Sequence, residues 1–168
     1  MNFRNAFMFV TVLAISSGCT GRRPGPPPPP QVFEVDAPLN DIWVSTVRWY
    51  TDHNLPILNM DRVSAFLRSD EIVLGPEDEV AGVSIRDLVD CGTNHLGAEY
   101  TKTGTTYLAI AVLLDEMTQN STSIRVQLSA HHVHVSDQAP RDKGCVSLGV
   151  LEPMVFDFVD SLVRQSSR

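Results

Sequence analysis

The fold of this 168-residue chain rests on TTYLAIAVLL, residues 105–114, and on TSIRVQLSAHHVHV, residues 122–135. The first segment is apolar at nearly every position, which is typical of a strand that is buried on both faces. In the second, apolar and polar residues alternate from Ile124 to Ala130, which indicates a strand with one buried face. A turn-forming Gln-Asn-Ser at residues 119–121 joins the two segments. The sequence therefore predicts a long antiparallel β-hairpin.

Shorter segments before this hairpin predict further strands. Residues 32–35 and 62–68 have the composition of strands, and residues 84–91 predict a strand, with a short helix as the alternative. Residues 75–82 are acidic and rich in turn formers, which predicts a loop.

Two segments predict amphipathic helices. The first begins near Asp36, which can cap it, has Pro38 in its first turn and ends near Asn54. The second spans residues 150–163, with Pro153 in its first turn. Two such helices and one sheet predict an α+β two-layer sandwich, with a mainly antiparallel sheet and both helices on one face. The helical spacing is carried by two apolar stripes, Leu39, Ile42, Trp43, Val47 and Tyr50 in the first helix, and Leu151, Val155, Phe158 and Leu162 in the second.

The charge changes sign along the chain. All twenty acidic residues lie after residue 30, and residues 31–168 hold only ten of the thirteen basic residues, so their net charge is −10. We expect residues 32–168 to form a single domain, which is an ordinary domain length. Its acidity excludes nucleic acid as the expected partner, because phosphates require a basic face.

The first eighteen residues have the composition of a signal peptide that ends before Cys19. Arg4 gives a basic start, and the apolar residues 6–15 form a run of about ten that would reach only about 15 Å as a helix, half of a bilayer core. The string AISSGC, residues 14–19, is similar to a bacterial lipobox, in which the cysteine becomes the lipidated first residue, although Ser16 stands where leucine is usual. We expect lipidation of Cys19; cleavage by the ordinary signal peptidase is the alternative.

The count of cysteines agrees with lipidation. Export places the chain in an oxidising compartment, where an odd cysteine is a free thiol or an intermolecular bridge. The chain has three cysteines, and lipidation of Cys19 leaves Cys91 and Cys145 to form a disulfide. Two buried free thiols are the alternative interpretation.

Residues 19–31 combine the lipidated N-terminus with a Pro-rich linker, which includes five consecutive prolines at residues 26–30. Polyproline is extended by about 3.1 Å per residue, so twelve residues reach about 35 Å. The composition predicts a stiff spacer that holds the domain away from the membrane. Arg22 and Arg23 lie close to the anchor, where they can meet anionic headgroups.

The order of elements resembles the helix-grip domain of the BamC/NlpB-type lipoproteins of the outer-membrane β-barrel assembly machinery. The resemblance is carried by VDAPLNDIW at residues 35–43, DRVS at residues 61–64 and the closing helix. DCG at residues 90–92 and GCVSLGVLE at residues 144–152 look like segments of uncharacterised proteobacterial lipoproteins of the same layout. That family has two such domains, whereas this chain has room for one.

The histidine-rich end of the second hairpin strand, His131-His132-Val133-His134, is the candidate metal site. On a strand, His132 and His134 share one face, His131 points the other way, and Asp137 is nearby. The apolar residues change faces here, which predicts a bulge or a frayed strand end with solvated histidines. We therefore expect no metal.

No catalytic motif is present in the sequence. A G-x-S-x-G nucleophile elbow is absent, and His53 and His95 have no partner that the sequence identifies, so both are expected on the surface. Residues 77–79 are acidic but lack EF-hand spacing. We expect a protein that is not an enzyme and has no cofactor.

Trp49 is the candidate contact for a protein partner. It lies about 120° around the first helix from Trp43, away from the apolar stripe. An exposed tryptophan is a favourable contact residue. The alternative is that Trp49 covers the edge of the sheet.

These observations together predict a lipoprotein of the outer membrane whose domain faces the periplasm. The expected function is that of a non-catalytic interaction or structural component of the envelope, and the resemblance implies a link to outer-membrane assembly. Thr20 after Cys19, in place of aspartate, implies outer-membrane sorting. The alternative function is binding of a lipid or other small ligand in a groove between helix and sheet.

Overall fold

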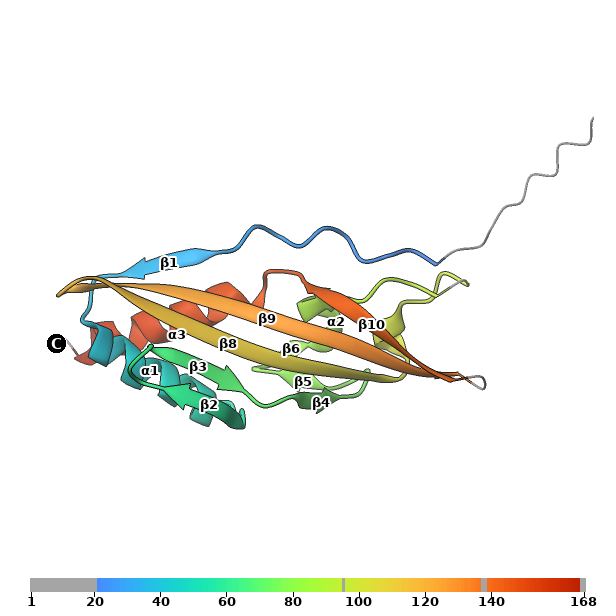
Figure 1. The fold of residues 1–168 in the computed structure, drawn as a ribbon, viewed down its shortest axis with the longest axis horizontal. Helices are drawn as coiled ribbons and strands as arrows, with labels where there is room; N and C mark the ends of the chain where they lie inside the picture. The colour runs from blue at the N-terminus through green and yellow to red at the C-terminus, as the bar shows by residue number, and fades with distance from the viewer. Residues whose placement is uncertain (1–20, 95, 137–138, 167–168) are drawn as a thin grey trace, which may run out of the picture.

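The computed structural model describes residues 21–94, 96–136 and 139–166, which form an α+β fold with a large antiparallel sheet (Figure 1). The predicted signal peptide, residues 1–18, and Cys19 lie outside the described residues. The elements in order are β1 (Val32–Val35), α1 (Leu39–Asp52), β2 (Ile57–Asp61), β3 (Phe66–Ser69), β4 (Ile72–Leu74), β5 (Glu79–Val80), β6 (Val83–Ser84), α2 (Ile85–Leu88), β7 (Val89–Asp90), a 3₁₀ turn η1 (Tyr100–Lys102), β8 (Thr105–Thr118), β9 (Ser121–Ser136), β10 (Ala139–Ser147) and α3 (Leu151–Ser166).

The predicted hairpin is confirmed and forms the centre of the sheet. β8 and β9 pair in register from Thr105 opposite Val133 to Glu116 opposite Thr122, with one irregularity next to the turn. The alternating apolar residues of β9 fill the core, as predicted. β8 was expected to be buried on both faces, but only one face is fully buried, since Tyr107, Ala111 and Leu113 on the other face are partly exposed. The expected bulge at the histidines is wrong, because β9 pairs there with β8 on one side and with β10 on the other.

Two shorter strands pair along each edge of the hairpin, one after the other. Along β8, β4 and β3 pair one after the other, and β2 pairs outside β3. Along β9, β1 pairs with residues 122–125 and β10 with residues 130–136. β10 then leaves β9 and pairs with β7 through Val146 and Ser147. All of these pairings are antiparallel.

The predicted strand at residues 62–68 is only partly correct. Residues 62–65 are a turn, and the strand β3 begins at Phe66. Asp61 stabilises the turn, because its carboxylate accepts hydrogen bonds from the Val63 N–H and the Ser64 hydroxyl at 2.9 and 2.7 Å. A short-range side-chain interaction thus overrides the weak alternation of the segment.

Both long helices lie where the apolar stripes predict them. Ile42 and Tyr50 of α1 are buried, and the Tyr50 hydroxyl donates a hydrogen bond of 2.9 Å to the Ile110 carbonyl of β8. Burial raises the pKa of the Tyr50 phenol. α1 begins later than expected, since Pro38 and not Asp36 precedes its first residue. A third, short helix α2 occupies the segment for which a strand was the first prediction and a short helix the alternative.

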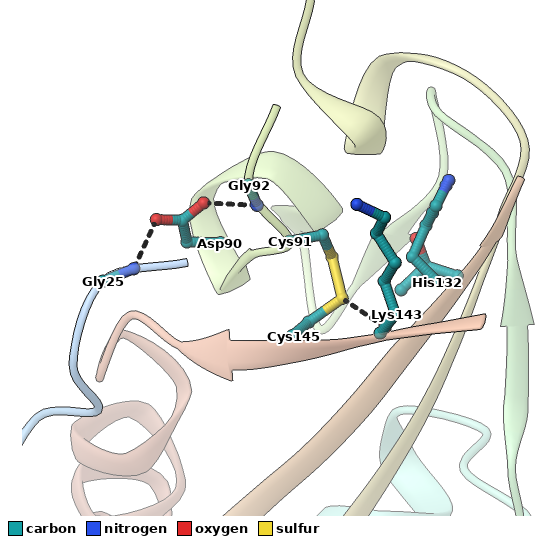
Figure 2. Close-up of a disulfide and its surroundings, with 8 residues drawn as sticks. Gly25, Asp90, Cys91, Gly92, His132, Lys143 and Cys145 are labelled. Atoms are coloured by element: carbon teal, nitrogen blue, oxygen red, sulfur yellow. Dashed lines mark hydrogen bonds between the residues drawn. A yellow bond between two sulfur atoms is a disulfide. The ribbon is translucent and has the colours of Figure 1, made fainter. Parts of the chain in front are cut away.

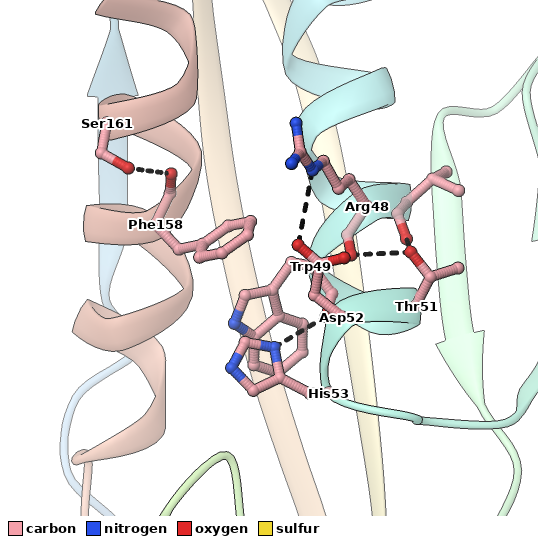
Figure 3. Close-up of polar contacts among 8 residues, drawn as sticks. Arg48, Trp49, Thr51, Asp52, His53, Phe158 and Ser161 are labelled. Atoms are coloured by element: carbon pink, nitrogen blue, oxygen red, sulfur yellow. Dashed lines mark hydrogen bonds and ion pairs between the residues drawn. The ribbon is translucent and has the colours of Figure 1, made fainter. Parts of the chain in front are cut away.

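Trp49 does not face outward, so the prediction that it contacts a partner protein is wrong. Its side chain is 1% exposed and lies between α1 and α3 (Figure 3). Its ring lies 5.0 Å from the ring of His53, which in turn is 5.7 Å from the ring of Phe158 in α3. α1 contacts both the sheet and α3, so it buries two faces, and a residue 120° from the first stripe falls on the second.

Replacing Trp49 with alanine tests this packing. We expect Trp49→Ala to lower the free energy of unfolding by about 3–5 kcal/mol, because a large buried side chain leaves a cavity. Val44, on the same helix, is 58% exposed, so Val44→Ala should change it by less than about 0.5 kcal/mol. Urea unfolding of both variants measures the difference. Equal stabilities would contradict the burial of Trp49.

Candidate functional site

The Pro-rich segment lies along the domain and does not project from it. In Figure 1 it runs in blue from β1 beside the sheet towards the yellow-green loop after β7. At that loop, the Arg22 N–H donates to the Thr93 hydroxyl at 2.9 Å, and the Thr93 N–H donates to the Arg22 carbonyl at 2.9 Å. The expectation of a spacer that holds the domain away is therefore wrong for the described part of the segment, residues 21–31.

Asp90 is the residue that holds the start of this segment. Its Oδ2 accepts hydrogen bonds from the Arg22 guanidinium at 2.9 Å and from the Gly25 N–H at 3.2 Å. Its Oδ1 accepts from the Gly92 N–H at 2.8 Å (Figure 2). Burial acts to raise the pKa of Asp90, but these backbone N–H groups and the Arg22 charge outweigh it and lower the pKa. We call Asp90, Arg22 and Gly25 the N-terminal clamp.

The N-terminal clamp is attached to the sheet through the next residue. Cys91 stands at disulfide-bonding distance from Cys145 of β10, 54 positions away in the sequence (Figure 2). A bridge that closes a loop of this length stabilises the fold by about 4 kcal/mol in the chain-entropy model. Gly92, at φ +79°, leaves room for the segment, because a Cβ there would collide with the Arg22 carbonyl oxygen. The cysteine count predicted this pair.

The other end of the Pro-rich segment is also held. The Gln31 side chain donates to the Gly149 carbonyl at 3.5 Å, and the ring of Phe33 in β1 stacks on Phe156 of α3 at 4.7 Å. The proline composition predicted an extended backbone, and in Figure 1 residues 21–31 run along the sheet without a helix. It gave no sign of the N-terminal clamp, because Arg22 and Asp90 are 68 positions apart and belong to no motif.

A groove of about 780 Å³ opens between the Pro-rich segment and the sheet. It lies beside residues 126–129 of β9, between the part that pairs with β1 and the part that pairs with β10. Among the described residues, no strand pairs with these four residues on the side away from β8. Continuing the register of β1 would place residues 28–31 opposite these four, and three of them are prolines, which have no N–H to donate. The groove is lined by residues 27–32, residues 125–128 of β9, residues 145–147 of β10 and Glu152 of α3.

The groove expected between helix and sheet is a smaller hollow. It has a volume of about 330 Å³ and lies at the start of α1, between Leu39 and Trp43 on the helix, Ala65 in the β2–β3 turn and Glu116 of β8. The larger groove was not predicted, because it depends on the path of the Pro-rich segment.

The histidines near the end of β9 are placed as predicted but are not all solvated. His131 stacks on Tyr107, while His132 and His134 lie on the opposite face near Tyr100. His132 is only 1% exposed, which corrects the expectation of solvated rings. Its Nδ1 hydrogen-bonds with the Thr106 hydroxyl at 3.0 Å.

A cation lies close to this histidine pair. Lys143 is opposite His132 in the β9–β10 register, Figure 2 shows the two side chains next to each other, and Lys143 Nζ lies 4.3 Å from the centre of the Tyr100 ring. His132 Nε2 and His134 Nδ1 are buried and have no hydrogen-bond partner of normal geometry. Burial, and then the neighbouring His134, lower the pKa of His132, while the Thr103 carbonyl opposes them.

In the described part of the chain, no group of three or more His, Cys, Asp or Glu side chains is placed to bind a metal ion. Asp137, the third ligand considered for His132 and His134, lies outside the described residues, as does His95. His53 packs on Trp49, and its Nδ1 lies 2.8 Å from the Trp49 carbonyl. None of the helices that the structure describes has the length and apolar character needed to cross a bilayer.

The sequence matches no protein-family model, and no curated protein is significantly similar to it.

Because His132 is buried and its pKa is lowered, we expect the free energy of unfolding to depend on pH. Its folded-state pKa is below the ordinary value of about 6.5, so the unfolded chain binds the proton more readily, and stability is lost as the pH falls below about 6.5. The contribution to the slope is at most about 1.4 kcal/mol per pH unit. Urea unfolding from about pH 7.5 to about pH 5 measures it.

His132→Gln should flatten this dependence, whatever it does to stability at neutral pH. His131→Gln removes a histidine from the opposite face of the same strand and should leave most of the slope. If the two variants keep the same slope as the wild-type protein, His132 is not the group responsible.

Proposed function

We propose that the protein is a lipid-anchored, non-catalytic component of the bacterial envelope, held to the outer membrane through Cys19 with its domain facing the periplasm. The observation that carries this proposal is the Cys91–Cys145 pair beside the N-terminal clamp. Disulfides are typical of exported proteins, and this one secures the loop that binds the start of the mature chain. The lipobox-like string before Thr20 supplies the lipid anchor.

We also infer that residues 32–168 form a single helix-grip-like domain, a two-layer sandwich of the BamC/NlpB type. The packing of α1 against α3, and of both helices against β9, supports this arrangement. The resemblance supports a structural or interaction role with an envelope protein as partner and a link to outer-membrane assembly. A non-catalytic role agrees with the chemistry of the described residues, because Asp90 is occupied by the N-terminal clamp and His132 is closed off from solvent.

Cys19→Ala tests the anchor. We expect the wild-type protein to be recovered in the membrane fraction and to incorporate a labelled fatty acid, and the variant to be soluble and unlabelled. Cys91→Ala/Cys145→Ala is the matched control, since it removes the other two cysteines and should still be labelled. If Cys19→Ala stays with the membrane, the anchor is wrong.

A second candidate function is the binding of a lipid or other small apolar ligand, and the 780 Å³ groove favours it. Its size is that of a site for a small molecule. Its walls combine proline rings with Val126 and Leu128, and Arg125 and Glu152 add charged groups. Such walls suit an acyl chain with a polar end.

Native mass spectrometry of the Cys19→Ala protein tests the groove without interference from the anchor. We expect a bound small molecule that survives purification, is retained in Val73→Trp and is lost in Val146→Trp. Val146 lines the groove, whereas Val73 is an exposed valine of β4. A protein with no added mass, or with the same added mass in both variants, would rule out this function.

A further inference from the structure

We propose that the loop formed by residues 93–94 and 96–103 lies on the lipid surface, so that the domain rests on the membrane by this end and is not held off it. This inference rests on the proposed anchoring through Cys19. The partner it commits to is the surface of a bilayer that contains anionic lipid.

The position of the anchor follows from the N-terminal clamp. Arg22 is bound to Thr93 in both directions and to Asp90, and Gly25 is bound to Asp90. Two peptide units separate Cys19 from Gly21, so their Cα atoms are at most about 7 Å apart. A lipid on Cys19 therefore enters the membrane next to this loop.

The loop presents an apolar side chain beside a set of hydrogen bonds that residues 96–98 make with Asn94. Leu96 is 80% exposed. The Asn94 side chain accepts hydrogen bonds from the Leu96 N–H at 2.9 Å and from the Ala98 N–H at 3.0 Å, and the Gly97 N–H donates to the Asn94 carbonyl at 3.0 Å. Thr93 and Glu99 pair across the base of the turn. An ordered turn can bury its apolar tip without an ordering cost at the moment of contact.

The charge at this end fits an anionic surface, and the charge elsewhere does not. Residues 21–25, 90–104 and 142–145 hold four basic and three acidic side chains, whereas the rest of residues 21–168 holds eight basic and seventeen acidic ones. Arg22 is two-thirds exposed although it is paired with Asp90. An anionic membrane therefore repels the remainder of the domain and leaves this end as the one that can approach.

Fluorescence quenching by brominated lipids tests the orientation. The lipidated full chain is reconstituted in phosphatidylethanolamine–phosphatidylglycerol vesicles with brominated acyl chains, as Leu96→Trp or as Val63→Trp. Val63 is 98% exposed in the β2–β3 turn, at the other end of β8 from Gly104, so it is the matched control. We expect several-fold stronger quenching of the added tryptophan at position 96. The native Trp43 and Trp49 are buried and form the same background in both variants.

Asp90→Ala in the Leu96→Trp chain tests the N-terminal clamp. The variant removes the two hydrogen bonds that Asp90 accepts from Arg22 and Gly25 and leaves the two between Arg22 and Thr93, so the start of the segment is held less firmly. We expect weaker quenching at position 96 while the protein still floats with the vesicles, and unchanged quenching would contradict the role of Asp90 in the orientation. Equal quenching at positions 96 and 63 in protein that floats would overturn the orientation and leave the anchor intact. Protein that does not float would overturn the anchor, and this inference with it.

Discussion

β9 is longer than either strand that pairs along its outer edge, and the rest of the structure follows from this mismatch. On the edge of β9 that faces away from β8, β1 pairs with residues 122–125 and β10 with residues 130–136. Among the described residues, no strand pairs with residues 126–129 on this edge. An open strand edge is a site for unwanted pairing, which proteins limit with proline and other blocking devices. Here the Pro-rich segment runs beside residues 126–129 of β9. Because prolines have no N–H to donate, the segment lines the groove and does not pair as another strand.

The second constraint is the pairing of the end of β10 with β7. By turning away from β9 at Cys145, β10 brings that cysteine to Cys91 and brings β7 to the edge of the sheet. Asp90, one residue before Cys91, is then fixed where it can accept three hydrogen bonds, two of them from the N-terminal segment. The disulfide therefore acts beyond its own loop, because it also fixes Asp90, to which the start of the Pro-rich segment is bound.

The sequence predicted those parts of the fold in which periodicity decides. The hairpin of β8 and β9, the helices α1 and α3 and the strand β1 each have an apolar pattern that agrees with their environment. Trp49 was misplaced because one stripe was assigned to α1, whereas a helix that packs on both a sheet and another helix buries two. β10 was missed because its nine residues include Pro140 and Gly144 and have little alternation, so its pairing depends on β9.

The candidate site was less predictable than the fold, for a related reason. Cys91 and Cys145 could be paired by counting, since each had only one available partner. The N-terminal clamp joins a carboxylate to two groups of a segment whose composition indicates a free linker, and nothing in local spacing distinguishes a linker that is bound from one that is not. His132 shows the same limit, because a histidine at a strand end is solvated unless another segment covers it, and here η1 and Gly104 do so.

The N-terminal clamp also changes the meaning of the proline run. A stiff segment that is bound only at one end would hold the domain away from the proposed anchor. The same segment bound at both ends instead determines which end of the domain lies next to that anchor. Because polyproline has little conformational freedom to lose, binding it along the domain costs less entropy than binding a flexible linker of equal length. Two hydrogen bonds to Asp90 and two to Thr93 hold one end of these eleven residues, and the Gln31–Gly149 hydrogen bond holds the other. In the proposed anchored protein, this direction matters more than distance, because the end of the domain beside Arg22 carries more basic than acidic side chains and the remainder is acidic.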